Sequence, residues 1–463
     1  MFLEINKKPA HHLALLDGAD LSITYGELSE YCGNFSQSIH ERTLLFILCT
    51  NSSGAIIGFV GAISKRVVPL LLSADIDDAL FGRLYDTYKP QYLWVPIENL
   101  SRFSGEVIYE AHGFALLKVS NPVFQMHEDL ALLLPTSGST GSPKLVRHSY
   151  TNLSSSARNV ASFFEISPDD RPAIALPMQY TMGLSVITSY LWAGATLVLF
   201  KQSLTDPTFW RLFKEHKVTS FTGVPYSFEI LAKLRFFRMD LPYLRLITQG
   251  GGKLKEELFV QYANFCNENG KRFIATYGQT EGTARMAFLP ADLSITKTGS
   301  IGRAIPAGQL SLIHDDGSET TEGEATGEMM YRGPNVTLGY AQSQDDLLLG
   351  DTFNGVLPTG DLAKRDADGC YYILGRLKRF LKLYGLRIGL DECEWLISNE
   401  FSTECLCGGN DEKMQVYITD AGCKDLIIPF LSAKTGLFIK ALEVIVVDEI
   451  PRAVSGKPIL NVV

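Results

Sequence analysis

A block of small hydroxyl residues and glycines follows an apolar run at residues 131–147, which read ALLLPTSGSTGSPKLVR. The residues able to grip a phosphate there are Thr136, Ser137, Gly138, Ser139, Thr140, Gly141 and Lys144. Glycine lets backbone N–H groups turn toward an anion, hydroxyls add donors, and lysine adds positive charge. The kinase-type pattern G-x-x-x-x-G-K-S/T is absent, because Gly138 and Gly141 are only three residues apart. The run therefore predicts a phosphate-binding loop of another kind.

A second candidate stretch, TYGQTEG at residues 276–282, follows the predicted strand RFIA at 272–275. Tyr277 could stack on a purine, Thr280 could donate to a phosphate, and Glu281 could hold Mg²⁺. Gly278 has no side chain, so a ligand could approach the backbone closely there. Taken alone, such a run is more often only a turn, so its interpretation depends on the other motifs.

Two further stretches near the end of the chain carry charge that suits a nucleotide. Asp361, in LPTGDL, can accept both hydroxyls of a ribose. Arg376 follows fifteen residues later, across a predicted hairpin with Asp368 and Gly369 at its turn. Lys457 lies on the glycine-bearing run PRAVSGKPIL. Exposed lysines and turn glycines are common, so each of these has a plain structural alternative.

The net charge of the chain limits which ligands its basic residues can bind. The chain has 463 residues and a net charge of −9, which disfavours a general binder of nucleic acid or of anionic membranes. The basic run at Arg376, Lys378, Arg379 and Lys382 is therefore predicted to serve a small anionic ligand rather than nucleic acid.

These residues must be positioned by a large fold, and 46% hydrophobic residues are enough to fill its core. Strand-like and helix-like runs alternate, as in LLFILC, SSGAIIGFVGAIS and RVVPLLL, and this order recurs up to PYSFEILAKL at 225–234. The alternation predicts an α/β fold class with parallel sheets covered by helices. Thr24 and Glu27 predict a capping box, and Pro225 predicts a helix start.

The sequence pattern changes near Lys297, where short turn-rich segments predict a small antiparallel β subdomain. We predict a large N-terminal domain over 1–374 and a small α+β C-terminal domain over 375–463. The apolar stretches at 55–72 and 185–200 are predicted as buried segments rather than membrane spans. Lys65 and Arg66 interrupt the first stretch, and the second is too short to cross a bilayer. The N-terminal residues lack a signal-peptide pattern, and the eight scattered cysteines suit a reduced, cytoplasmic protein.

In their joint order these motifs resemble those of the adenylate-forming superfamily: acyl-CoA synthetases, peptide-synthetase adenylation domains and beetle luciferases. TSGSTGSPK is similar to its phosphate loop, YGQTE to its adenine and metal motif, and TGD to its ribose motif. GRLKRFLKLYGLRI resembles the hinge and lid motif, and PRAVSGK the catalytic-lysine motif. The resemblance implies ATP and Mg²⁺ as cofactors and a carboxylic acid as substrate. It also implies an acyl-AMP intermediate and a thiol acceptor, either CoA or a phosphopantetheine.

The resemblance also assigns roles to individual residues. Lys457 and Glu281 would act in adenylation, with Mg²⁺ on Glu281. Lys378 would be the hinge about which the small domain swings, and Lys382 would act after that swing, in thioester formation. The acyl pocket would include Tyr180, Gly183, Gly251 and Gly252.

The acid pocket departs from the amino-acid-activating relatives. Those proteins place an Asp close to the position of Gly183, where it pairs with the α-ammonium of the substrate. Because glycine can pair with nothing, a buried ammonium there would be costly. The sequence thus favours a non-amino carboxylic acid. Two alternatives stay open: an enzyme that loads a carrier protein or activates an amino acid, and a non-catalytic nucleotide-binding homologue.

Overall fold

The computed structural model describes residues 1–135, 144–377, 379–383, 386–410 and 412–452. Contacts divide the chain into two compact units. The first consists of Met1–Gln309 and Arg332–Leu357, and the second of Leu310–Tyr331 with the chain from Pro358 onward. The predicted boundary between residues 374 and 375 separates a large domain from a small domain that we expect to move. This boundary stays a prediction.

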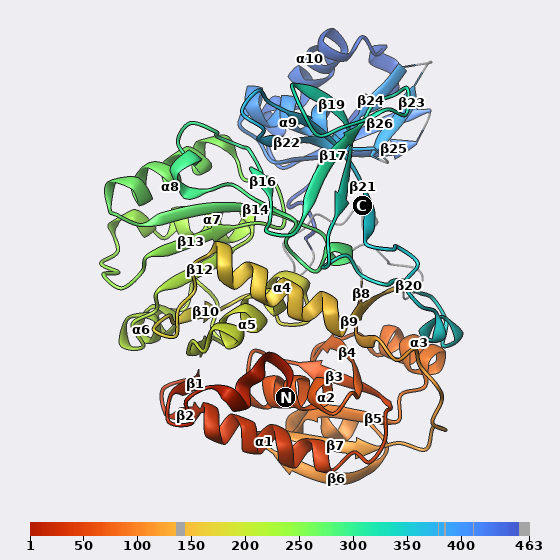
Figure 1. Ribbon diagram of the computed structural model, residues 1–463. Helices are drawn as coiled ribbons and strands as arrows, with labels where there is room; N and C mark the ends of the chain where they lie inside the picture. The colour runs from red at the N-terminus through yellow and green to blue at the C-terminus, as the bar shows by residue number, and fades with distance from the viewer. Residues whose placement is uncertain (136–143, 378, 384–385, 411, 453–463) are drawn as a thin grey trace. The chain divides into compact units, whose positions relative to one another are not determined.

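One sheet of the first unit is built mainly from parallel strands. Its strands are β1 Leu13–Asp17, β2 Leu21–Thr24, β10 Pro172–Ile174, β11 Leu197–Leu199, β12 Ser220–Gly223, β13 Leu246–Gln249, β14 Arg272–Tyr277, β15 Ala287–Phe288 and β16 Arg303–Ala304. They lie in the order β16-β15-β14-β13-β12-β10-β11-β1-β2, and the pairs from β14 through β1 are parallel (Figure 1).

A second sheet of this unit mixes parallel and antiparallel pairs. Its strands are β3 Leu44–Cys49, β4 Val68–Ser73, β5 Tyr92–Pro96, β6 Glu106–Ala111, β7 Phe114–Lys118, β8 Leu130–Pro135, β9 Leu145–Ser149 and β20 Gly339–Ala341. Their order is β20-β9-β8-β4-β3-β5-β7-β6. The strand β3 pairs in parallel with β4 and β5 and is buried along its whole length, which explains its unbroken apolar sequence.

Helices fill the space between the two sheets and cover their outer faces. They are α1 Tyr25–Gln37, α2 Ser53–Ser64, α3 Asp78–Tyr88, α4 Tyr150–Phe163, α5 Thr181–Ala193, α6 Pro207–Glu215, α7 Pro225–Lys233 and α8 Glu256–Glu268. Residues of α1, α2, α4 and α5 share one core with both sheets. The helices α6, α7 and α8 pack on the other face of the first sheet, and α3 packs on that of the second. The predicted layering of helices on parallel sheets is confirmed.

Local signals in the sequence account for several helix starts. Thr24 and Glu27 form the predicted capping box of α1, in which each side chain accepts a hydrogen bond from the other residue's backbone N–H. Pro225 occupies the first turn of α7, as predicted. The helix α2 is buried on nearly every side, so its sequence is apolar without an exposed polar face.

The second unit begins with antiparallel strands, as the short turn-rich segments predict. The strands are β17 Gln309–Ile313, β18 Glu319–Thr320, β19 Ala325–Arg332, β21 Val356–Arg365 and β22 Tyr371–Arg376, in the order β18-β17-β19-β21-β22. The C-terminal part adds β23 Phe380–Leu383, β24 Leu386–Gly389, α9 Leu390–Phe401, β25 Cys405–Asn410, β26 Lys413–Ile418, α10 Lys424–Thr435 and β27 Leu442–Val446. It encloses its own apolar core, which fits the predicted α+β character.

Short 3₁₀ turns connect these elements at η1 Phe2–Lys7, η2 Ile97–Arg102, η3 Phe236–Arg238, η4 Thr280–Gly282, η5 Ala291–Leu293, η6 Asp345–Leu348, η7 Ala421–Cys423 and η8 Ile439–Ala441. Within the described residues, no helix is both long enough and apolar enough to cross a bilayer. The eight cysteines are free, and burial raises the pKa of Cys405 to about 12.

Candidate active site

The two ends of the predicted phosphate loop are held side by side by an antiparallel pair of strands. Pro135, at the end of β8, pairs with Leu145, at the start of β9. The predicted loop residues Thr136, Ser137, Gly138, Ser139, Thr140 and Gly141 lie outside the described residues. Lys144 is described, and it stands directly before β9. The strands therefore fix where the loop leaves and rejoins the sheet.

Tyr340 links two of the predicted site residues. The Lys144 Nζ atom lies 3.3 Å from the centroid of the Tyr340 ring, a cation–π contact. The Tyr340 hydroxyl donates a hydrogen bond of 2.8 Å to Glu281 Oε1. Burial, together with the neighbouring Glu281 charge, raises the pKa of Tyr340, so the phenol remains a donor at neutral pH. The fold thus brings the predicted phosphate lysine and the predicted Mg²⁺ carboxylate to one tyrosine.

Sequence reasoning missed Tyr340, because its position depends on strand pairing rather than on a local pattern. The strand β20 pairs with β9, with Tyr340 opposite Val146. In addition, the backbone N–H of Thr337 donates to the Glu281 carbonyl oxygen at 2.9 Å. Thr337, just before β20, therefore positions the backbone of Glu281, and Tyr340, within β20, positions its side chain.

Replacing Tyr340 with phenylalanine should weaken the use of Mg²⁺ while keeping the ring over Lys144. Loss of one hydrogen bond to Glu281 is expected to cost about 1 kcal/mol, or roughly a fivefold rise in the Mg²⁺ concentration needed for half-maximal activity. Mg²⁺ titrations of the acid-dependent ATP–pyrophosphate exchange measure this change. Tyr340→Leu should have a larger effect, whereas Tyr243→Phe, on a distant surface, should have none. An unchanged Mg²⁺ requirement in Tyr340→Phe would show that this hydrogen bond does not position Glu281.

The backbone around Gly278 packs unusually tightly. The strand β14 runs on through Tyr277, so it is two residues longer than the predicted strand at 272–275. A Cβ atom on Gly278 would collide with the carbonyl oxygen of Ala284, where the chain turns back with positive φ. Glycine is therefore required here for a steric reason. The Tyr277 hydroxyl accepts a hydrogen bond of 3.1 Å from Gln279 Nε2.

The residues predicted for the acyl pocket come from two neighbouring elements of the first unit. Tyr180 immediately precedes α5, and Gly251 has a φ of +78° in the turn after β13. The side chain of Gln249 braces this turn by donating to the Gly252 carbonyl oxygen at 2.7 Å. A Cβ atom on Gly251 would lie 3.4 Å from Met182 Cε, so the first turn of α5 lies against the glycine turn.

Gly183 is buried in the first turn of α5, and it has no room for a side chain. A Cβ atom there would collide with the carbonyl oxygen of Pro177. An aspartate could not be placed at residue 183 in this backbone. Thr181 of the same turn faces the YGQTE stretch, because its Oγ1 lies 3.5 Å from Thr280 Oγ1.

In the second unit, Asp361 and Arg376 lie opposite each other on β21 and β22. Asp361 Oδ1 lies 3.1 Å from Arg376 Nε, and the Asp361 side chain is 3% exposed while that of Arg376 is 54% exposed. The predicted hairpin is confirmed, since Gly369 has a φ of +79° at its turn. The Asp361 backbone N–H donates to Thr359 Oγ1 at 3.1 Å. The carboxylate is thus held at a defined position on a strand.

The remaining predicted residues belong to the C-terminal part of the chain. Lys378 and Lys457 lie outside the described residues. Lys382 is on β23, where its backbone pairs with Arg387 of β24. Its proposed role in thioester formation therefore stays a prediction.

The described residues fit a Mg²⁺ ion that is held largely by a nucleotide. Mg²⁺ in such sites keeps waters and binds phosphate oxygens plus one or two carboxylates. Glu281 offers one carboxylate whose orientation is fixed by Tyr340. Across the part of the chain that the structure describes, no group of three or more His, Cys, Asp or Glu side chains is arranged to hold a metal. Glu281 can thus contribute to a nucleotide-bound ion but not build a closed cage.

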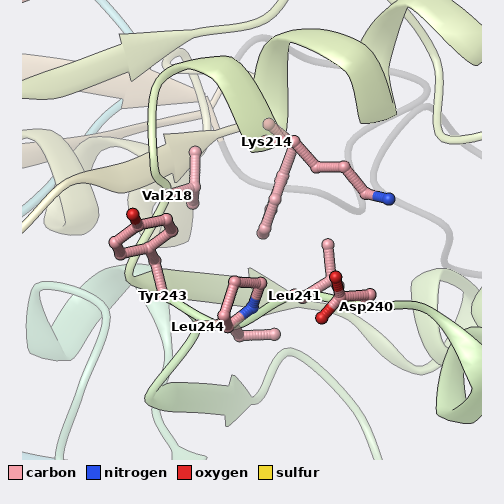
Figure 2. Close-up of a pocket in the computed structure, with 8 residues that line it drawn as sticks. Lys214, Val218, Asp240, Leu241, Tyr243 and Leu244 are labelled. Atoms are coloured by element: carbon pink, nitrogen blue, oxygen red, sulfur yellow. The ribbon is translucent and has the colours of Figure 1, made fainter.

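A separate cavity of about 200 Å³ opens beside the end of α6. Figure 2 shows its lining, with Lys214 and Val218 facing Asp240, Leu241 and Tyr243. None of the described residues predicted for the active site contributes to this lining. We therefore place no part of the predicted site in this cavity.

Comparison with known proteins identifies the family of the chain. The family profile described as AMP-binding enzyme matches residues 2–341. The chain is 32% identical over 345 residues to indoleacetate–CoA ligase of Aromatoleum aromaticum, covering 70% of this chain and 65% of that protein. It is 29% identical over 348 residues to oxalate–CoA ligase of Arabidopsis thaliana, covering 71% of this chain and 66% of that protein. The matches thus span slightly less than two thirds of these relatives.

The fold is similar to that of solved adenylate-forming structures. O-succinylbenzoate coenzyme A synthetase from Bacillus subtilis, in complex with AMP, superposes with a TM-score of 0.80 at 23% identity. The alignment covers 99% of this chain and 97% of that one. The predicted α/β fold class is confirmed by this likeness, and the profile match confirms the predicted superfamily. The chain belongs to the AMP-binding enzyme family.

Proposed function

We propose that this protein is an AMP-forming ligase that activates a non-amino carboxylic acid with ATP and transfers the acyl group to a thiol, that of CoA. The observation that carries this proposal is the convergence of Lys144 and Glu281 on Tyr340 at the base of the phosphate loop. A cation and a metal-binding carboxylate at this place suit a nucleotide triphosphate with its Mg²⁺. The ligase names of the relatives agree with this chemistry.

The first half-reaction joins two anions, so it depends on charge neutralisation rather than on a general base. A carboxylate oxygen attacks the α phosphorus of ATP, and the bond from that phosphorus to pyrophosphate breaks. Lys144 and the loop donors would hold the outgoing phosphates, and Mg²⁺ at Glu281 would offset their charge. Lys457 would stabilise the negative charge that develops on the α phosphate. The product is acyl-AMP, which carries a good leaving group.

The second half-reaction transfers the acyl group to a thiol. The sulfur attacks the acyl carbon, the carbon–oxygen bond to AMP breaks, and a thioester forms. We propose that residues 375–463 swing about Lys378 between the two steps, withdrawing Lys457 and presenting Lys382. Asp361 and Arg376 would hold the ribose throughout. A CoA thiol is the proposed acceptor, with a carrier-protein phosphopantetheine as the alternative.

The geometry at Gly183 favours an acid without an α-amino group. Amino-acid-activating enzymes need a carboxylate for the substrate ammonium, and residue 183 has no space for one. Burying an ammonium group without a partner would cost several kcal/mol of binding free energy. Acyl, aryl and hydroxy acids avoid this loss.

Acid-dependent ATP–pyrophosphate exchange over a panel of acids tests the proposed substrate class. Non-amino acids are expected to drive exchange at least about tenfold better than α-amino acids of the same size, because 1.4 kcal/mol already corresponds to a factor of ten. Each amino acid should be paired with its deamino analogue as a matched control. If an L-amino acid gave the fastest exchange, our interpretation of the pocket would be wrong.

The same assay, extended with acceptors, separates CoA from a carrier protein. Thioester formation with free CoA at a rate comparable to exchange would support the CoA ligase. Exchange without turnover on CoA, together with acylation of a phosphopantetheinylated carrier protein, would favour the alternative. Absence of exchange with every acid would favour a non-catalytic nucleotide-binding homologue.

A further inference from the structure

Arg285 is a charged side chain buried in the first unit, and it has no polar partner among the residues that the structure describes. Its side chain has no exposed surface, and its Nε, Nη1 and Nη2 atoms form no hydrogen bond with any residue that the structure describes. Burial lowers the pKa of Arg285 to about 10, a shift that neighbouring Tyr190 opposes, so the guanidinium remains charged at neutral pH. A buried and unpaired charge is strongly unfavourable, which indicates that a partner is supplied from elsewhere.

The aromatic contact of Arg285 does not satisfy its donors. The guanidinium carbon lies 4.7 Å from the centroid of the Phe164 ring, and this cation–π contact stabilises the charge only in part. The five N–H groups of arginine lie in the plane of the guanidinium and fit a carboxylate in a two-bond fork. Arg285 is therefore prepared for an anionic ligand with planar oxygen acceptors.

The surroundings of Arg285 connect it to the predicted acyl pocket. One face of the first sheet carries a series of hydroxyl residues, which are Ser220, Thr222, Thr248 and Thr276. At one end of this series, Thr276 Oγ1 lies against Gly250 of the glycine turn. At the other end, Ser220 Oγ accepts a hydrogen bond of 2.7 Å from the Tyr190 hydroxyl of α5. Polar groups thus lead from the glycine turn to the neighbourhood of Arg285.

The backbone also places Arg285 close to the YGQTE stretch. Arg285 follows Glu281 by four residues, and its Cα atom packs against the backbone of Gly278. Tyr190 lies seven residues beyond Gly183 on α5, so about 10 Å of helix separates the start of the predicted pocket from Tyr190. An acid that begins at the YGQTE stretch and extends along α5 would reach Arg285 with its far end.

A second group of buried polar atoms lies beside this path. His148 Nε2 and Ser185 Oγ have no hydrogen-bond partner in the described part of the chain, and both residues line a cavity of about 10 Å³. This volume fits about one water molecule, not an acid. The acid would therefore enter only if side chains moved apart. Met182 is suited to such movement, since it covers the glycine turn with an unbranched, flexible side chain.

We propose that Arg285 is a specificity-determining residue that pairs with a second carboxylate at the far end of the substrate, so that the substrate class is a dicarboxylic acid. This inference rests on the proposed function, because it assigns the distal group of the acid that is activated. The second carboxylate supplies a hydrogen-bond partner for Arg285 that the described residues do not provide.

The test compares dicarboxylic acids of increasing length with their monoamides, which match them in size but lack the second charge. In ATP–pyrophosphate exchange, wild-type protein should prefer a dicarboxylic acid over its monoamide by about 100-fold or more, as expected for a desolvated charge pair. Arg285→Gln should abolish this preference. Arg158→Gln, which changes an exposed arginine of α4, is the matched control and should retain it.

The inference would be overturned if wild-type protein used monocarboxylic acids or monoamides as well as dicarboxylic acids. It would also be overturned if Arg285→Gln kept the preference for dicarboxylic acids. If no acid supported exchange, the proposed function would fail, and thermal unfolding would then decide the role of Arg285. A rise in Tm with a dicarboxylic acid in wild-type protein but not in Arg285→Gln would support an anion site at Arg285. Equal rises, or none, would overturn it.

Discussion

Replacing Lys457 with alanine is expected to remove about 2.7–4 kcal/mol of transition-state stabilisation from acyl-AMP formation, by analogy with the loss of one preorganised donor. The negative charge on the α phosphate grows during this step, and a lysine amino group at this place would offset it. The variant should still convert supplied acyl-AMP and thiol into thioester, because that step breaks a bond at the acyl carbon instead. Feeding the protein either ATP plus acid or pre-made acyl-AMP plus CoA measures the two steps separately.

Lys382→Ala is the matched comparison for Lys457→Ala, and its effect should be the reverse. Exchange should stay intact, while the formation of thioester from acyl-AMP should slow. Lys382 lies on β23, four residues beyond the proposed hinge at Lys378. If both variants slowed both half-reactions equally, the proposed change between two domain orientations would be rejected, and Lys457 would have a structural role.

Asp361→Ala should weaken the binding of ATP and acyl-AMP by about 2–3 kcal/mol, or about 30- to 150-fold in Kd. The Asp361 carboxylate is almost fully buried and already paired with Arg376 Nε. A carboxylate offers about four lone-pair sites, so it can accept ribose hydroxyls in addition to this ion pair. Calorimetric titration with ATP measures the change in affinity, and thermal unfolding confirms that the variant is folded.

Asp368→Ala provides the control for this prediction. Asp368 is exposed at the turn of the same hairpin, so its removal should leave nucleotide affinity unchanged. A folded Asp361→Ala variant that bound ATP as tightly as the wild-type protein would remove Asp361 from the ribose site.

The parts of the fold that depend on local sequence could be predicted well. The strand β3 was predictable because a strand buried on both faces needs an unbroken apolar run. The starts of α1 and α7 followed from Thr24 and Pro225, whose effects reach only a few residues along the chain. The hairpin that pairs Asp361 with Arg376 was equally predictable, since Gly369 marks its turn.

Other features depend on contacts between distant residues, and the sequence does not contain a local signal for them. Tyr340 reaches Glu281 only because β20 pairs with β9, far away along the chain. The steric role of Gly183 follows from the approach of the Pro177 carbonyl, which the motif pattern does not reveal. Arg285 carries no motif that predicts burial, and its lack of hydrogen-bond partners among the described residues follows only from the three-dimensional packing.

The central claim, activation of an acid through acyl-AMP, is tested most directly with a substrate acid whose carboxylate carries a heavy oxygen isotope. Attack on the α phosphorus makes a carboxylate oxygen the bridge to AMP, and transfer to the thiol then breaks the bond between that oxygen and the acyl carbon. The AMP released with the thioester should therefore contain one labelled oxygen, as measured by mass spectrometry. Unlabelled AMP, or release of ADP in place of AMP, would contradict the account.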